Sequence, residues 1–211
     1  MRHREEEGDW KGGFLFVGNQ LVLDLLHTRP VIEGEPTELL SDLDAVMAWF
    51  QVAGLIGTAQ GVALRRDWKH LPNAGHAVSQ IHEFRETLRR EVLAWEGGGT
   101  IGRSTIEEVN KLLAAHPKLI HLRTDSAVEK NELRTESWYE IQKPPDLLGP
   151  LAHAAAELFT QTDRTRVRKC EHTKCVLHFL DTSKNGTRRW CSMKMCGNRL
   201  KVAAYAARQR D

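Results

Sequence analysis

The segment that decides the C-terminal part of the fold reads Cys170-Glu-His-Thr-Lys-Cys175 and, after fifteen further residues, Cys191-Ser-Met-Lys-Met-Cys196. All four cysteines of the 211-residue chain lie in these two pairs. Zinc favours four thiolates in a tetrahedron, and two closely spaced pairs joined by a loop can supply them. We therefore predict one structural zinc ion bound by Cys170, Cys175, Cys191 and Cys196. Free buried cysteines or two disulfides would not explain why all four fall in one short segment.

The residues between the pairs indicate a hairpin. Residues 176–183 and 187–190 are strand-like, and Lys184-Asn185-Gly186 separates them. Asn-Gly favours a tight turn because both residues accept positive φ. We expect this hairpin to bring the two cysteine pairs together. A helix with one apolar face is expected from Cys196 onward.

Two histidines lie close enough to the cysteines in sequence to be mistaken for ligands. Catalytic zinc sites keep a position open for water, whereas four cysteines close the coordination sphere. We therefore expect the zinc to support folding rather than chemistry. His172 and His178 are expected at exposed positions of the finger.

The residues around the second pair carry a family resemblance. Arg188-Arg-Trp-Cys-Ser-Met-x-x-Cys-Gly-Asn-Arg199, with Phe179-x-Asp181-x-Ser183 before it, resembles the CGNR zinc finger of bacterial stress-induced transcription regulators. In that family an N-terminal ABATE domain precedes the finger, and its opening is similar to the run Gly18–Thr28. His27 stands in that run where Asn is usual. The resemblance implies a zinc-dependent, DNA-binding transcription regulator of the bacterial cytoplasm that acts in the stress response.

Charge is divided unevenly along the chain. Residues 163–211 have a net charge of +9, whereas the rest of the chain has a net charge of −7. Such asymmetry indicates a nucleic-acid-facing module on an acidic body. The basic residues expected to contact DNA are Lys184, Arg188, Arg189, Lys194, Arg199, Lys201 and Arg208. The alternative is a solvated basic face that balances the negative zinc–thiolate cluster.

The first part of the chain reads as mainly helical. Amphipathic spacing predicts helices over about 39–53, 58–68, 77–96 and 147–159, and Ser104-x-x-Glu107 has the pattern of a capping box. Residues 119–124 and 133–141 predict an antiparallel hairpin, and residues 21–26 could form a strand or a helix. The expected fold is α+β: a mainly helical domain over residues 10–160, followed by a treble-clef-like four-cysteine zinc finger over residues 165–211.

Other functional classes are less well supported. No apolar run approaches the ~20 residues that a membrane-spanning helix needs. Asp24 and the first-domain histidines His27, His76, His82, His116 and His121 are scattered and form no triad or metal motif, so we expect no enzyme.

The expected partner is DNA. A small-molecule or protein effector is expected at the N-terminal domain, and a homodimer is compatible with the sequence. The alternative function is a zinc-finger module that docks a protein or an RNA without sequence-specific DNA binding.

Overall fold

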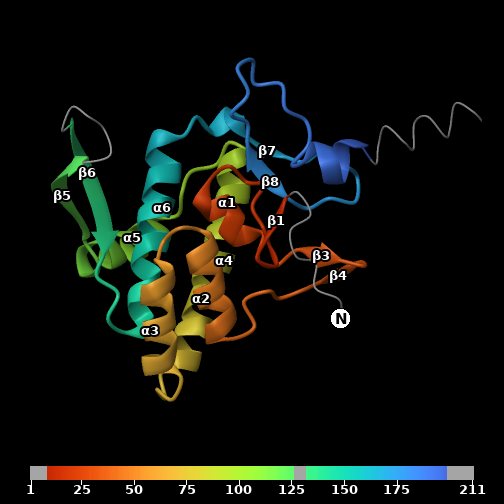
Figure 1. Ribbon diagram of the computed structural model, residues 1–211. Coiled ribbons are helices and arrows are strands. Elements are labelled where there is room, and N and C mark those ends of the chain that lie inside the picture. The colour runs from red at the N-terminus through yellow and green to blue at the C-terminus, as the bar shows by residue number, and fades with distance from the viewer. Residues whose placement is uncertain (1–8, 126–131, 199–211) are drawn as a thin grey trace, which may run out of the picture.

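The computed structural model describes residues 9–125 and 132–198. Its α-helices are α1 (Leu21–Leu26), α2 (Leu43–Val52), α3 (Thr58–Trp68), α4 (Ala74–Glu96), α5 (Arg103–Ala115) and α6 (Leu148–Gln161). Its strands are β1 (Trp10–Lys11), β2 (Phe14–Leu15), β3 (Val31–Ile32), β4 (Glu35–Pro36), β5 (Lys118–Asp125), β6 (Glu132–Tyr139), β7 (Val167–Lys169) and β8 (His178–Leu180). The strands form four antiparallel pairs in chain order. The α+β expectation is confirmed, with helices forming most of the body (Figure 1).

The helices of the body share one apolar core. In α4 the buried residues Ala77, Ile81, Phe84, Leu88 and Val92 recur every three or four positions. This spacing places them on one face of the helix, which packs against α1, α2 and α6. Burying each large apolar side chain contributes about 1.5–3 kcal/mol relative to leaving it in water. The long helix predicted from sequence is therefore confirmed as the centre of the domain.

The ambiguous run at residues 21–26 is a helix. Its beginning is fixed by Gln20, whose side-chain oxygen accepts from the backbone N–H groups of Val22 at 2.6 Å and Leu23 at 3.3 Å. These groups have no partner within the helix, so the cap satisfies them. The helix then continues through five buried residues.

The predicted capping box at Ser104 is wrong. Helix α5 has its N-cap at Gly102, two residues before Ser104, and no side chain of its own caps it. The carboxylate of Glu91 on α4 accepts from the Gly102 N–H and from the Thr105 hydroxyl, each at 2.8 Å. A tertiary contact thus replaces the local cap, and a sequence pattern that considers only local partners cannot find it.

The predicted first-domain hairpin is confirmed. Strands β5 and β6 pair in antiparallel register from Lys118 opposite Tyr139 to Asp125 opposite Glu132. Its base packs on α6, where the Tyr139 ring lies 5.2 Å from that of His153. In Figure 1 the hairpin stands on the left and the finger on the upper right, so α6 and the body separate them.

The predicted hairpin of the finger is wrong in its pairing. Strand β8 pairs with β7, with Val167 opposite Leu180 and Lys169 opposite His178. Residues 187–190 form no strand. The Asn-Gly sequence does mark a turn, in which Gly186 has φ of 61°. Residues 187–190 are instead held by hydrogen bonds between their backbone and the side chains of Asp181 and Arg168.

The end of the described chain also differs from expectation. A short π-helical turn spans Met193–Gly197, so the helical segment begins before Cys196. Ser192 precedes it and accepts from the Met195 N–H at 3.1 Å. The predicted apolar face at Leu200, Ala203, Ala204 and Ala207 lies outside the described residues.

The N-terminal segment belongs to the core of the finger. Leu15 and Val17 are buried against Phe179 and the cysteines, and Trp10 packs on the same cluster. Conversely, Val167 at the start of the finger is buried in the helical core. Each apolar core therefore contains residues from the other part of the chain: N-terminal residues in the core of the finger, and Val167 in the core of the helical body. Among the described residues, no helix combines the length and apolar character that crossing a membrane requires.

Candidate metal centre and nucleic-acid interface

The four cysteines converge on one point. Their Sγ atoms all lie within 4.8 Å of one another. The Sγ of Cys191 lies 3.7 Å from that of Cys175 and 3.6 Å from that of Cys196. Zinc–sulfur bonds of about 2.3 Å in a tetrahedron require sulfur–sulfur separations of about 3.8 Å. The cluster therefore fits one zinc ion, as predicted.

The protonation chemistry of the cluster also favours a metal. The hydrogen bond with Cys175 lowers the pKa of the Cys170 thiol, the hydrogen bond with Cys170 raises that of Cys191, and burial raises the pKa of Cys196 to about 12. Thiolates packed this closely repel one another unless a cation lies among them. A bound zinc ion supplies that cation, so all four sulfurs are held as ligands and the polypeptide around them is cross-linked.

Backbone hydrogen bonds position the ligands. The Cys170 N–H donates to the Leu177 carbonyl at 2.9 Å, which closes the loop that carries the first pair. The Cys196 N–H donates to the Ser192 carbonyl at 3.0 Å within the π-helical turn. Cys170, Cys191 and Cys196 are buried, and Cys175 is half-buried. The first pair thus comes from a turn after β7; of the second pair, Cys191 precedes the π-helical turn and Cys196 lies within it.

The buried Asp181 carboxylate organises the loop between the pairs. It accepts from the Ser183 N–H at 2.9 Å, the Ser183 hydroxyl at 2.5 Å and the Arg188 N–H at 2.8 Å. Arg166 and Arg168 donate from the other side of the loop to backbone carbonyls. The Asp-x-Ser part of the family motif is therefore a scaffold that replaces the predicted second strand.

Arg188 points inward rather than toward solvent. Its guanidinium donates to the carbonyls of Val17 at 3.2 Å, Trp190 at 2.8 Å and Cys191. It also lies 4.3 Å from the centre of the Phe179 ring. A planar group with five donors suits several carbonyls at once. The geometry thus gives Arg188 a fold-supporting position between the N-terminal segment and the metal-binding turn.

Gly197 of the Cys-Gly-Asn-Arg run is explained by packing. A Cβ atom at this position would lie 2.8 Å from the Met193 sulfur and 3.0 Å from Cδ1 of Trp190. Glycine here lets the turn pack closely on the Trp190 ring, and a larger residue would require Met193 and Trp190 to shift. Trp190 is half-buried against the cysteine cluster and so belongs to the core of the finger.

The other residues predicted to contact DNA differ in whether their charged groups are exposed and unpaired. Lys184 and Lys194 are exposed and form no ion pair with any residue in ranges 9–125 and 132–198. Arg189 is exposed, but its guanidinium binds the Glu171 carboxylate at 2.6 Å and lies 4.8 Å from the Trp190 ring centre. Arg199, Lys201 and Arg208 lie outside the described residues.

The two finger histidines occupy different environments. His172 is half-buried, and its Nδ1 accepts from the Lys174 N–H at 3.2 Å. His178 was expected to be exposed but is buried, with its Nε2 3.0 Å from the Glu96 carboxylate at the end of α4. The contact to α4 explains the difference, because burial here comes from the first domain. Glu96 also accepts from the Lys169 N–H at 3.1 Å.

The run Gly18–Thr28 holds the finger to the first domain. The Leu180 N–H donates to the Gly18 carbonyl at 2.8 Å, and the Asn19 amide donates to the Leu180 carbonyl at 3.2 Å. His27 Nε2 lies 2.8 Å from the His178 carbonyl oxygen. We refer to these contacts, together with those of Glu96, as the interdomain latch. Sequence reasoning did not find it, because its backbone acceptors carry no sequence signal.

The remaining first-domain candidates do not come together. His82 bonds the Leu40 carbonyl at 2.8 Å, and His116 lies 3.6 Å from Asp146, which caps the start of the next helical segment. His121 lies on the exposed hairpin and contacts Glu136 at 3.0 Å. In the described part of the chain, these histidines are distributed over separate structural contacts.

Comparison with known families agrees with this architecture. A family model described as "CGNR zinc finger" matches residues 166–209. A second model, ABATE, described as "Putative stress-induced transcription regulator", matches residues 19–162, more than half of the chain. The chain belongs to the ABATE family. The resemblance noted in the sequence is therefore confirmed, with the ABATE region first and the CGNR finger second. No curated protein matches the chain.

Within the ABATE and CGNR framework the motifs have distinct structural tasks. The opening run of the ABATE region forms most of the interdomain latch. The CGNR motif supplies two metal ligands, the glycine that packs on Trp190, and the inward-pointing Arg188. The family places this protein among zinc-binding proteins of the regulator type, in agreement with the four-cysteine cluster.

Proposed function

We propose that this protein is a transcription regulator of the bacterial cytoplasm whose zinc-organised finger binds DNA. The observation that carries the proposal is the four-cysteine cluster in a segment with a net charge of +9. A small basic unit fixed by a metal presents its charges in a defined arrangement, which suits the regular spacing of duplex phosphates. Clustered thiols that bind zinc also suit a reducing compartment.

The contacting residues are the exposed ones. Lys184 on the turn after Asp181 and Lys194 on the π-helical turn are free to neutralise phosphates, and Arg189 can exchange Glu171 for a phosphate. The further contacts proposed from the sequence are Arg199, Lys201 and Arg208. Arg188 is removed from the contacting set, because its donors already bind carbonyls of the protein.

The first domain has the role of transmitting a signal to the finger. The interdomain latch joins α1 and the end of α4 to β7 and β8, so a change in the helical body reaches the finger through backbone contacts. A small-molecule or protein effector, or a second copy of the chain, would act through this connection. We propose a regulatory role in stress and not an enzymatic one.

The alternative is a finger that docks an RNA or a protein. Docking of a protein is favoured by the pairing of Arg189 with Glu171, which leaves fewer free cations on the described part of the finger. The test is selection of duplex DNA from a random library by the zinc-loaded full chain. The proposal predicts enrichment of a short common sequence. Selection of RNA but not duplex DNA, or of neither, would favour the alternative.

A further inference from the structure

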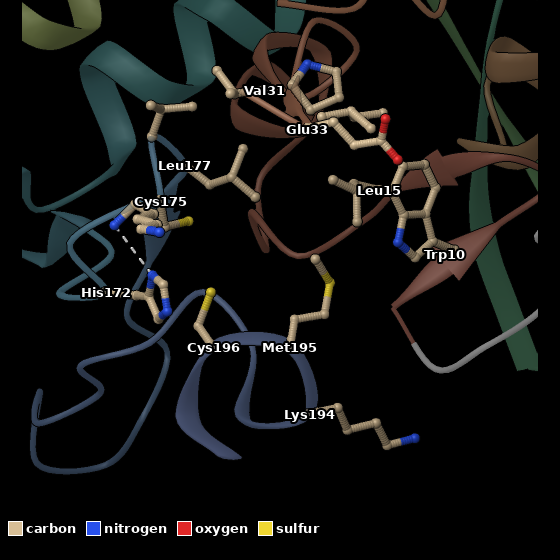
Figure 2. Close-up of a pocket in the computed structure, with 14 residues that line it drawn as sticks. Trp10, Leu15, Val31, Glu33, His172, Cys175, Leu177, Lys194, Met195 and Cys196 are labelled. Atoms are coloured by element: carbon tan, nitrogen blue, oxygen red, sulfur yellow. Dashed lines mark hydrogen bonds between the residues drawn. The ribbon is translucent and has the colours of Figure 1, made fainter. Parts of the chain in front are cut away.

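A cavity of about 760 Å³ lies where the finger meets the N-terminal strands. One wall comes from the N-terminal segment and the β3–β4 hairpin, through Trp10, Leu15 and Val31. The opposite wall comes from the finger, through Leu177 and Met195. Figure 2 shows Leu15, Leu177, Met195 and Cys196 arranged around a common hollow. We call this cavity the junction pocket.

The junction pocket is larger than the metal site beside it. Cys175 and Cys196 line one end, and the four sulfurs there enclose room for one ion. The remaining space extends from the cysteines to Trp10 and the β3–β4 hairpin. Its volume falls in the range of about 300–1,000 Å³ that is typical of small-molecule sites.

The lining combines apolar side chains with polar and charged ones. Lys174 and Lys194 belong to it from the finger side, and Glu33 from the hairpin side. Neither lysine has an ion-pair partner among residues 9–125 and 132–198. Arg188 does not line the pocket, and its guanidinium already donates to the Cys191 carbonyl. The lysines are therefore available to an anionic group.

The shape favours a small molecule over a nucleic acid. Duplex DNA presents a convex, charged backbone and has no apolar body to fill a concave space lined by tryptophan, leucine and methionine. A compact organic anion fills the apolar space with its body and directs its charged group to Lys174. Lysine acts there as a mobile point charge on a flexible stem.

We propose that the junction pocket binds a small organic anion with an apolar body, such as an aromatic or branched carboxylate. The ligand contacts the finger and the N-terminal strands at once, so its binding stabilises their association. The binding step needs no DNA. A failure of this proposal is therefore distinguishable from a failure of DNA binding by the finger.

The test is calorimetric titration of the zinc-loaded full chain with 2-naphthoate, in parallel with the neutral 2-naphthalenemethanol and the cationic 2-naphthylmethylammonium. We expect saturable binding of the carboxylate, at least about tenfold tighter than that of either analogue, because only the carboxylate forms a charge-assisted bond with lysine. Equal binding of the neutral compound, tighter binding of the cation, or no saturable binding of the carboxylate would overturn the proposal.

Variants locate the bound anion. Lys174→Ala and Val31→Asp should each weaken 2-naphthoate binding about tenfold or more, the second because it adds a negative charge to the apolar wall. Lys184→Ala and Val62→Asp are matched controls at exposed positions that do not line the pocket, and they should bind like the parent. Zinc content and helical circular dichroism establish that each variant is folded. Equal effects of pocket and control variants would contradict the assignment.

Discussion

His27 Nε2 lies 2.8 Å from the carbonyl oxygen of His178, and this contact joins the first helix of the domain to the second strand of the finger. Both residues are buried. Because the acceptor is a carbonyl, Nε2 carries the proton and Nδ1 is the unprotonated nitrogen. Nδ1 has no hydrogen-bond partner among residues 9–125 and 132–198 and lies 3.7 Å from the Asp24 carboxylate. The interdomain latch therefore depends on a neutral histidine.

The first prediction concerns the latch. His27→Ala leaves the buried His178 carbonyl without its donor, which should cost about 1–3 kcal/mol of stability. His27→Asn, which introduces the usual family residue, should restore part of the loss through its amide donor. The measurement is hydrogen exchange of the β7 and β8 amides together with chemical unfolding. His76→Ala, at an exposed position on α4, is the control. Unchanged exchange at β8 in His27→Ala would show that the contact contributes nothing.

The second prediction concerns pH. Burial lowers the pKa of His27 to about 3, so the unfolded chain takes up a proton below about 6.5 that the folded protein refuses. The contribution of His27 to the free energy of unfolding therefore has its full value above about pH 6.5 and is about 2 kcal/mol smaller at pH 5. Burial raises the pKa of Asp24 to about 6 from 3.8, so the folded protein takes up a proton first and gains about 1.4 kcal/mol by pH 5.

The two effects oppose each other and can be separated by substitution. Relative to the parent, His27→Asn should gain about 2 kcal/mol of unfolding free energy between about pH 8 and pH 5, and Asp24→Asn should lose about 1.4 kcal/mol. Differences from the parent cancel contributions from the zinc ligands. Unfolding titrations at both pH values measure them. Parallel pH profiles for all three proteins would refute the assignment of charge states.

The third prediction separates structural from DNA-contacting arginines. Arg188→Ala should destabilise the finger by about 2–4 kcal/mol because three carbonyls lose their donor, and Arg188→Lys should recover less than half, since an ammonium lacks the planar geometry. Arg189→Lys is the matched control and should change stability by less than about 1 kcal/mol. Zinc release measured with a chromogenic chelator reports both. Equal zinc retention in Arg188→Lys and the parent would return Arg188 to the DNA-contacting set.

The fourth prediction concerns the metal and the two parts of the chain. The protein should bind one zinc ion, and Cys191→Ser should bind none. Removal of zinc should unfold the finger while the helical core, proposed as a separate unit over residues 10–160, keeps its circular dichroism. Leu15 and Val17 should lose exchange protection with the finger, because their burial comes from its cluster. Loss of the whole helical signal in one step would show that the two parts fold as one unit.

Sequence patterns predicted the elements whose stability is local or periodic. The spacing of Ile81, Phe84 and Leu88 identified α4, and the strand-like runs 119–124 and 133–141 identified β5 and β6. The cysteine spacing identified the ligand set, because zinc chemistry restricts which residues can take that role. Such elements can be predicted from the sequence without knowledge of the tertiary contacts.

The errors arose where a distant residue decides local structure. The Glu91 carboxylate takes the place of the cap expected from Ser104. The loop that includes residues 187–190 is held by the buried Asp181 and by Arg166, Arg168 and Arg188, where a strand was expected. His178 is buried only because α4 ends beside it. Propensity and turn signals do not encode such partners, so the exposure of His178 and the pairing of β8 could not follow from sequence patterns.

The central claim is that the zinc-loaded finger binds duplex DNA, and its most direct test is the salt dependence of that binding. Neutralising about four to six phosphates gives a slope of log affinity against log salt of roughly −4 to −5. The double variant Lys184→Ala/Lys194→Ala should reduce the steepness by about two, whereas Lys69→Ala/Lys111→Ala, on the helical body, should leave it unchanged. Fluorescence anisotropy of a labelled duplex over a range of salt concentrations measures the slope. A zinc-loaded protein with no salt-dependent affinity for any duplex, or a double variant with the parent's slope, would contradict the account.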